Sequence, residues 1–279
     1  MSPGGRRFYK MSGSGNDFVF IDGRTEPAAD WCTLEAIQRI CARGTGVGAD
    51  GIVILRRSQA HGATVGIDYW NSDGSLASLC GNATLCATRL AVELGAAVEG
   101  PAGLQIETGA GVLAARLVDG LPEFDLDPVA EVRPDYPAGL AAGESRIGFA
   151  VAGVPHLVVR WRDDLGIDAA PLNNRGAVLR HDAGQPAGAN VNFACREPQG
   201  RWTMRTFERG VEGETLACGT GAVATAILLE AWGEGGDATD LVTRSGRVLT
   251  VRLKRSGSAW LPTLRGEGRM VFEGLVRDL

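Results

Sequence analysis

The chain has 279 residues and a formal net charge of −5, from 28 lysines and arginines against 33 aspartates and glutamates. This acidic balance argues against a nucleic-acid partner, because nucleic-acid binders normally present a basic face. No apolar run approaches the roughly 18 residues that a membrane span requires, and the N-terminus lacks the apolar segment of a secretory signal. We therefore expect a globular, cytoplasmic protein of one large or two medium domains, with no membrane partner.

Short strands and three helices are expected along the chain. A helix should follow Thr33, which can act as its N-cap with Glu35 in the first turn. Two further helices should follow Cys80 and Cys218, where the sequence is free of proline and rich in Ala and Leu. Alternating or β-rich runs that end in Gly, Asp or Asn predict strands at residues 18–22, 51–55, 64–70, 104–108, 111–117, 157–161, 191–195, 202–207, 240–244 and 248–253.

The sequence contains an internal duplication. The segments that begin at Cys80 and Cys218 both open Cys-Gly, continue as an apolar run and end in glycine fifteen residues later. The alternative to a duplication is a chance match between Gly- and Ala-rich segments. Four ungapped pairs of segments, however, share the same offset of 138 positions. The other pairs are residues 12–22 with 150–160, 51–55 with 189–193, and 69–75 with 207–213, followed by 108–117 with 244–253 at an offset of 136.

The duplication predicts two similar α/β halves. The Pro- and Gly-rich residues 131–148 are expected to form a connection near the boundary between them. The six cysteines are not expected to form a disulfide framework in a cytoplasmic chain of this size. No metal site is expected, because there is no CxxC spacing and the three histidines are scattered. Only Lys10 and Lys254 could form the Schiff base that pyridoxal phosphate requires.

Cys80 and Cys218 are the candidate reactive groups. Each is expected at a helix N-terminus, where unpaired N–H groups and the helix dipole favour a thiolate and can bind a carboxylate. A buried cysteine is otherwise an inert small hydrophobe, and we interpret Cys32, Cys41 and Cys195 in that way. Cys86 aligns with Ala224 and is also expected in the core.

Two thiols in matching positions suggest a two-base reaction. A racemase must remove a proton from one face of a carbon and return one to the other face. A thiolate and a thiol on opposite faces do this directly, and two helix N-termini at the substrate carboxylate would stabilise the carbanion-like transition state. This chemistry requires no cofactor, which agrees with the shortage of lysine.

Several long motifs resemble the diaminopimelate epimerase family. They are KMSGSGNDFVFID, GVGADGIVIL, NSDGSLASLCGN, NVNFA and ERGVEGETLACGTGA, in this order and across nearly the whole chain. The resemblance implies an α/β (α+β) fold of two pseudo-symmetric halves, each a mixed or antiparallel sheet around a central helix that begins at a catalytic cysteine. It implies a homodimer, and a last strand around 270–279 that returns to the first half. The expected halves are residues 1–118 with 266–279, and residues 119–265.

The resemblance also implies an activity and a set of site residues. The activity is pyridoxal-independent epimerisation of LL- to meso-diaminopimelate, in lysine and peptidoglycan precursor synthesis, and the partner is this small-molecule amino-acid substrate. Glu208 and His156 would lie near the reacting amino group. The matching bases are Cys80 and Cys218, the carboxylate-binding helix starts are Gly81, Asn82, Gly219 and Thr220, and the pocket is lined by Asn16, Asn71, Asn190 and Arg209.

Plainer interpretations of these polar residues remain open. Asn16 and Asn71 both occur in turn-like sequence, where asparagine is common for backbone reasons. Glu208 and Arg209 could form a solvated charge pair.

Three positions depart from the family pattern. Val154 stands where the family has an asparagine that touches the distal end of the substrate, Leu85 where it has an arginine, and Ser12 where it has His or Gln. Both thiols and both helix starts are intact, so the reaction type is expected to survive. Val154 leaves open a racemase of another amino acid on the same scaffold. A protein in which Cys80 and Cys218 form a redox-switchable disulfide is a further alternative.

Overall fold

A computed structural model describes residues 5–25, 27–100 and 103–277. The chain forms two compact units, residues 1–124 with 266–279 and residues 125–265, here called the N-terminal and C-terminal units. The N-terminal unit extends to Phe124, beyond the boundary expected at residue 118, because the strand after that position pairs with the strand before it. Among the helices of the described residues, none is long and apolar enough to span a membrane.

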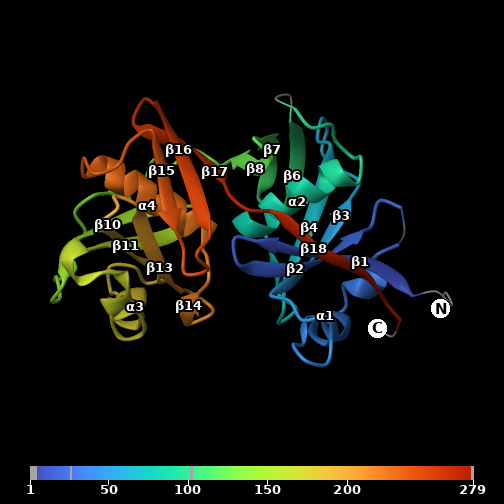
Figure 1. The fold of residues 1–279 in the computed structure, drawn as a ribbon, viewed down its shortest axis with the longest axis horizontal. Coiled ribbons are helices and arrows are strands. Elements are labelled where there is room, and N and C mark those ends of the chain that lie inside the picture. The colour runs from blue at the N-terminus through green and yellow to red at the C-terminus, as the bar shows by residue number, and fades with distance from the viewer. Residues whose placement is uncertain (1–4, 26, 101–102, 278–279) are drawn as a thin grey trace. The chain divides into compact units, whose positions relative to one another are not determined.

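The N-terminal unit is built on a mixed sheet (Figure 1). Its strands follow the order β18-β1-β2-β3-β4-β6-β7-β8, in which only the β2–β3 and β4–β6 pairs are parallel. The short β5 pairs with β4. The strands are β1 (Arg6–Gly13), β2 (Asn16–Asp22), β3 (Gly51–Arg56), β4 (Val65–Asn71), β5 (Leu76–Ala77), β6 (Leu104–Thr108), β7 (Gly111–Val118), β8 (Leu121–Asp125) and β18 (Arg269–Val276), and the helices are α1 (Leu34–Cys41) and α2 (Gly81–Glu93).

The C-terminal unit repeats this arrangement. Its strands follow the order β9-β10-β11-β12-β13-β15-β16-β17, in which only β11–β12 and β13–β15 are parallel, and β14 pairs with β13. The strands are β9 (Val132–Arg133), β10 (Glu144–Ala152), β11 (Val154–Trp161), β12 (Asn190–Arg196), β13 (Trp202–Glu208), β14 (Gly213–Thr215), β15 (Ala238–Val242), β16 (Val248–Ser256) and β17 (Ala259–Arg265), and the helices are α3 (Leu172–Arg180) and α4 (Gly219–Ala231).

The two units therefore share one topology, as the duplication predicts. α2 and α4 begin 138 positions apart and have equal length, and each follows its cysteine directly. Thr33 caps α1 as expected, with its hydroxyl oxygen accepting from the Ala36 N–H over 3.2 Å; such a cap stabilises a helix by about 1 kcal/mol.

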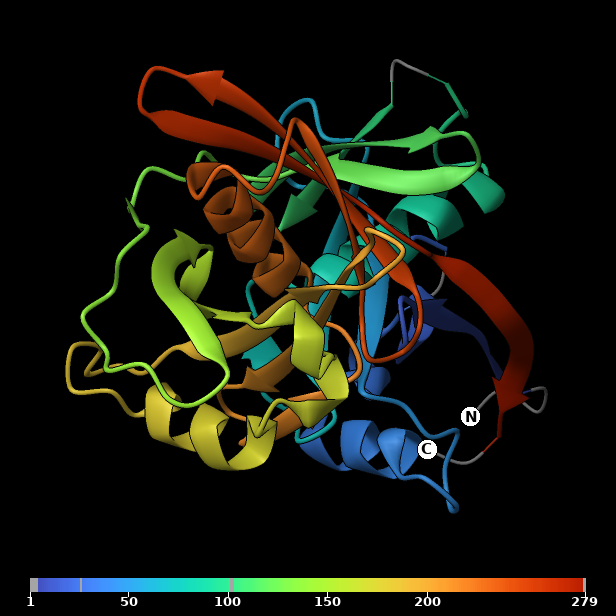
Figure 2. The ribbon, with the colours of Figure 1, turned by 60° about the vertical axis from the view of Figure 1, so that its left-hand side comes forward.

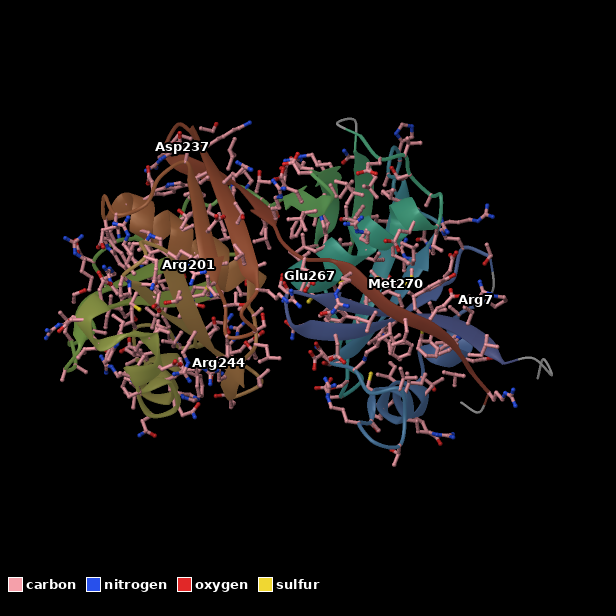
Figure 3. The ribbon with its side chains drawn as sticks, in the orientation of Figure 1. Arg7, Arg201, Asp237, Arg244, Glu267 and Met270 are labelled. Atoms are coloured by element: carbon pink, nitrogen blue, oxygen red, sulfur yellow. The ribbon has the colours of Figure 1, made fainter. Side chains whose placement is uncertain are left out.

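Three regions differ from the sequence-based expectation or extend it. Residues 131–148 do not simply connect the halves: they lie in the C-terminal unit and contain β9 and the start of β10. α3 was not expected, although it is the counterpart of α1 in the repeat. The last strand, β18, pairs with β1, and Figure 3 labels Met270 on β18 and Arg7 on β1; residues 278 and 279 lie outside the described part of the chain.

Each cysteine-led helix lies against the sheet of its own unit. α2 contacts β1, β3, β4, β7 and β18, and α4 contacts β10, β11, β12 and the β15–β17 strands. Figure 2 shows α4 beside the β16–β17 hairpin. Ten of the thirteen residues of each helix are buried, so burial of apolar surface on nearly all sides holds the helix start in place.

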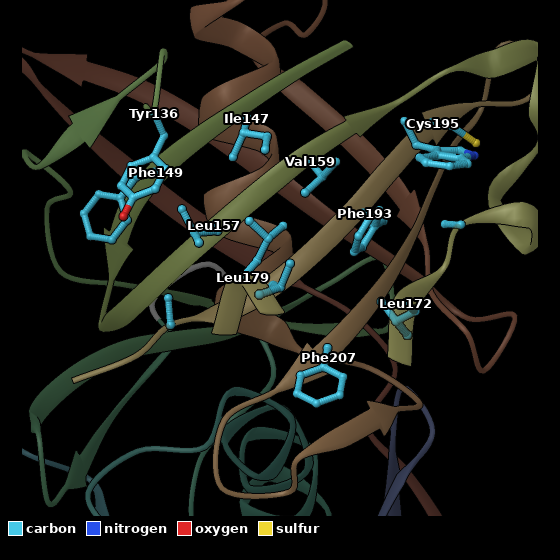
Figure 4. Close-up of a cluster of buried hydrophobic side chains, with 14 residues drawn as sticks. Tyr136, Ile147, Phe149, Leu157, Val159, Leu172, Leu179, Phe193, Cys195 and Phe207 are labelled. Atoms are coloured by element: carbon cyan, nitrogen blue, oxygen red, sulfur yellow. The ribbon is translucent and has the colours of Figure 1, made fainter. Parts of the chain in front are cut away.

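A second layer of the C-terminal core lies between its sheet and α3. Phe149, Leu157, Phe193 and Phe207 from four neighbouring strands pack with Leu179 of α3 (Figure 4). This core fixes the strand ends on which the candidate site residues of this unit stand.

Candidate active site

Cys80 is the N-cap of α2. Its backbone is extended, and the helix starts at the buried Gly81 and Asn82. The first N–H groups of a helix have no carbonyl acceptor within it, and the dipole makes that end positive. The half-buried thiol and these N–H groups together form a place where an anion is stabilised. We call Cys80, Gly81, Asn82 and Asn16 the Cys80 half-site.

Asn16 and Asn82 are brought together by the fold. The Asn82 amide donates to Asn16 Oδ1 over 2.6 Å, and the Asn16 amide donates to Asp50 Oδ2 over 2.9 Å. The same Asp50 oxygen accepts the backbone N–H of Asp17 over 3.2 Å. A carboxylate therefore fixes the amide orientation of Asn16, which in turn holds the first turn of α2. The sequence indicated both asparagines but not Asp50.

Two cations contact the carboxylates of Asp17 and Asp50. Lys10, only 7% exposed, donates to Asp17 Oδ2 over 2.6 Å and also to the Gly48 carbonyl. Arg43 bridges Asp17 and Asp50 at 2.6 and 2.7 Å. Burial would raise the pKa of Asp17, but the hydrogen bonds and charges of Arg43 and Lys10 outweigh it and the pKa is lowered. Asp17 therefore remains ionised at neutral pH.

Asn71 lies at the end of β4, in the hairpin that leads to β5. Its Oδ1 accepts from the Tyr69 hydroxyl over 2.8 Å, and its amide donates to Ser75 Oγ over 2.9 Å. These are the local bonds of a turn residue. The half-buried Asn71 stands at the carboxyl end of its strand, and a substrate-binding role for it remains a prediction.

Cys218 is the N-cap of α4 and is 7% exposed. Its Sγ accepts the Gly221 N–H over 3.4 Å and lies 3.6 Å from Thr220 Oγ1. A sulfur that accepts from the helix N-terminus is stabilised as a thiolate. Gly153, in the β10–β11 turn, has a φ of +72° and lies beside Thr220. We call Cys218, Gly219, Thr220 and Gly221 the Cys218 half-site.

His156 is fully buried in the same unit, on β11. Burial, with the positive charge of Arg209 adding to it, lowers the pKa of His156 to about 3. The imidazole is therefore neutral at physiological pH. Its Nδ1 lies 3.2 Å from Asn192 Nδ2, and its buried Nε2 makes no hydrogen bond within the described residues.

Asn190, Glu208 and Arg209 gather at neighbouring strand ends. Asn190 Oδ1, on the buried first residue of β12, accepts the Arg209 N–H over 2.7 Å. The Arg209 guanidinium donates to the carbonyls of Ala187 and Gly188 at 3.3 and 3.4 Å. Glu208 is the last residue of β13 and is half-buried. The structure thus brings Asn190 and Arg209 together. The two carbonyl contacts use only Nη1 of the Arg209 guanidinium, so its other N–H groups can bind a further acceptor.

The four remaining cysteines are poor nucleophiles. Burial raises the pKa of Cys32 and Cys41 to about 11, and burial also raises the pKa of Cys86 and Cys195. A thiol with a raised pKa is protonated at neutral pH and reacts slowly. Cys86 is fully buried and Cys195 lies in the core shown in Figure 4, so both occupy the core as expected.

The three departures from the family pattern have separate locations. Val154 is the half-buried first residue of β11, two residues before His156. Leu85 is fully buried in α2, where an apolar side chain fits the core of the N-terminal unit. Ser12 is on β1 and pairs with Asp17 of β2 and Arg269 of β18.

Sequence comparison places this architecture among known proteins. A family model described as diaminopimelate epimerase matches residues 8–129 and again residues 149–270. The chain is 50% identical to a diaminopimelate epimerase of Gemmatimonas aurantiaca, over 98% of this chain and 99% of that protein. It is 36% identical to a diaminopimelate epimerase of Aquifex aeolicus, over 97% and 98% of the two chains.

The fold is also found in solved structures. A probable proline racemase from Agrobacterium radiobacter superposes with a TM-score of 0.69, covering 97% of this chain and 92% of that one. The two sequences are 17% identical, so this likeness concerns the fold alone.

Proposed function

This chain belongs to the diaminopimelate epimerase family, a family of isomerases, and we propose that it converts LL-2,6-diaminopimelate to meso-diaminopimelate without a cofactor. The observation that carries the proposal is the repeated placement of a cysteine at the N-cap of a buried helix, at Cys80 and at Cys218. In this reaction the two units act as the two halves of one enzyme, and each supplies one thiol. The product serves lysine and peptidoglycan precursor synthesis, which agrees with a cytoplasmic location.

The proposed mechanism is a two-base proton transfer. One cysteine begins as thiolate and removes the proton from one face of Cα, while the other begins as thiol and donates its proton to the opposite face. The reverse reaction starts from the opposite protonation state. Because the active form holds one proton between the two thiols, Cys80 and Cys218 would titrate as a coupled pair. No bond other than C–H and S–H forms or breaks.

The two helix starts would bind the substrate carboxylate at the reacting centre. The N–H groups that follow Gly81 and Gly219 point out of the positive helix ends and would stabilise the charge that develops as the proton leaves. Asn82 and Thr220 stand at the same helix starts and are proposed to contact the substrate. Because Asn82 is held by Asn16, we include Asn16 in this part of the site.

The distal end of the substrate is proposed to bind at the strand ends. Asn71, Asn190 and Arg209 would line this region, with Arg209 pairing the distal carboxylate. Glu208 is proposed to lie near the reacting amino group and to pair with its positive charge. His156 is assigned to the neighbourhood of the same centre; its neutral form means that it adds no positive charge there.

A homodimer is proposed from the surface of β18. Val271 and Leu275 are 44% and 55% exposed, and Phe272, which packs edge-on against Phe8, is 48% exposed. Exposed large apolar side chains such as Val271 and Leu275 favour burial against a partner. The molar mass by light scattering is expected to be that of a dimer, and Val271→Glu with Leu275→Glu is expected to give the monomer. A wild-type monomer at micromolar concentration would overturn this proposal.

The same scaffold acting on another amino acid is the second candidate. Val154 favours it, because valine cannot make the hydrogen bond that the family asparagine makes to the distal end of the substrate. Incubation with LL-diaminopimelate under reducing conditions, without added cofactor, separates the candidates. Formation of the meso isomer supports the first, whereas epimerisation of only a different amino acid supports the second. Absence of both reactions contradicts the epimerase proposal.

A further inference from the structure

Asn192 occupies a buried position between three elements of the C-terminal unit. It is fully buried on β12 and makes three hydrogen bonds. Its amide nitrogen donates to the Leu157 carbonyl over 3.2 Å and lies 3.2 Å from His156 Nδ1. Its Oδ1 accepts from the Thr206 hydroxyl over 2.9 Å. Asn192 is two residues after Asn190, and it is not among the residues that the family resemblance places in the substrate site.

The orientation of this amide is determined by its partners. A backbone carbonyl only accepts, so the Leu157 carbonyl requires the Nδ2 end of Asn192 on its side. A flipped amide would place two acceptor oxygens against each other at that point, and burial makes such a pair costly. The second hydrogen of the same Nδ2 is then directed at His156 Nδ1, which must accept it.

We propose that Asn192 is a positioning residue that holds His156 in the tautomer with its proton on Nε2. His156 Nδ1 is occupied as an acceptor, so Nε2 carries the proton of the neutral ring. His156 Nε2 is buried and makes no hydrogen bond within the described residues. It is therefore an N–H donor for a negatively charged or carbonyl acceptor at the reacting centre, whereas the ammonium group there is left to Glu208. The low pKa of His156 agrees with a ring held neutral.

Asn192 also touches the start of α4. A Cβ atom at position 221 would overlap Asn192 Oδ1, so only glycine fits in the first turn of the helix there. The amide that orients His156 thus packs directly against the turn that donates to Cys218 Sγ. The buried Asn192 side chain therefore links the His156 imidazole to the Cys218 half-site. The role of this tautomer in catalysis rests on the proposed function.

Imidazole nitrogen shifts in the intact protein test the tautomer. At pH 7 the long-range ¹⁵N–¹H spectrum of the wild type should show His156 protonated at Nε2 and bare at Nδ1. His181 gives an internal contrast, because its Nδ1 lies 3.0 Å from the Ala177 carbonyl and must carry a proton to bond there. A His156 protonated at Nδ1, or a doubly protonated ring, would overturn the proposal whatever the enzyme acts on.

Substitution tests the positioning role. Asn192→Asp keeps the shape but offers Nδ1 only an acceptor, so it should move the proton of His156 to Nδ1 and lower kcat about tenfold or more, with a smaller change in KM. The matched control is Asn174→Asp on the exposed face of α3, which should change neither. An Asn192→Asp protein with the wild-type tautomer and kcat would contradict the proposal. If the Asn192→Asp protein does not fold, the wild-type spectrum alone tests the tautomer. If that spectrum shows the expected tautomer but the protein has no epimerase activity, only the proposed function is refuted.

Discussion

The Asn82 amide donates to Asn16 Oδ1 over 2.6 Å, across 66 positions of sequence. This bond joins the first turn of α2 to the start of β2, so the helix end that follows Cys80 is fixed to the sheet. Asp50 holds the other side of the Asn16 amide. The Cys80 half-site is therefore oriented by a carboxylate that we do not expect to touch the substrate.

Removal of this carboxylate should weaken the reaction without removing either thiol. Asp50→Ala is expected to lower kcat/KM about tenfold, because the Asn16 amide loses its orienting acceptor, and to cost about 1–3 kcal/mol of stability. Steady-state kinetics and urea unfolding measure the two effects. Asp237→Ala, at an exposed position of the C-terminal unit, is the matched control. Unchanged kinetics in a folded Asp50→Ala protein would show that the network is only structural.

Loss of either proposed base should abolish epimerisation. Cys80→Ser and Cys218→Ser are each expected to lose at least about a thousandfold in kcat, because a hydroxyl is a far weaker acid than a thiol and is not deprotonated there. Cys86→Ala should retain most activity and lose about 1 kcal/mol of stability from its fully buried position. Near-normal turnover by Cys218→Ser would contradict the two-base assignment.

The distal contact can be restored by substitution. If the proposed substrate is right, Val154→Asn should raise kcat/KM for diaminopimelate, mainly through a lower KM, because it adds a hydrogen bond at the distal end. A gain of a few-fold corresponds to about 1 kcal/mol. Val154→Leu is the control, because leucine has nearly the shape of asparagine but no hydrogen-bonding group. No change would mean that other residues already make this contact.

His156 should make the free energy of unfolding depend on pH, and most carboxylates do not yet titrate in the upper part of its window, between pH 6.5 and 5. The folded-state pKa of about 3 is below the ordinary value of 6.5, because the ring is buried and Arg209 is near. The unfolded chain therefore binds the proton first, and stability that is fully present above pH 6.5 is lost as the pH falls toward 3, by at most about 1.4 kcal/mol per pH unit.

Chemical denaturation at several pH values measures this loss. His156→Phe removes the titrating group. Phenylalanine is chosen because Phe18 occupies the matching position in the other half of the repeat. Its free energy of unfolding should change less between pH 6.5 and 5 than that of the wild type. Parallel curves for the two proteins would show that His156 is not buried as described.

The repeat made much of the fold predictable. The ten expected strands and the helices after Thr33, Cys80 and Cys218 all correspond to observed elements. α3 was missed because it buries only Leu172, Gly176 and Leu179 and has Asn and Gly within it, so its apolar periodicity is weak. The start of β10 was missed because prolines and glycines precede it, although the repeat places it opposite β1.

The candidate site was predictable only in part. Cys80 and Cys218 could be recognised because the same local pattern occurs twice. The roles of Asp50 and Asn192 could not, because each depends on side-chain hydrogen bonds to residues of a different strand, distant in the sequence. Residue type and spacing do not show which way an amide points, and this orientation is set by the surrounding donors and acceptors.

Solvent deuterium tests the two-base claim most directly. LL-diaminopimelate is incubated with the reduced enzyme in deuterium oxide, and substrate and product are separated early in the reaction. With one thiol on each face, the meso product should carry deuterium at the inverted Cα, while the recovered LL substrate should carry almost none. A meso product that keeps the substrate's own hydrogen would show that one base serves both faces, and would contradict the assignment of Cys80 and Cys218 as a pair.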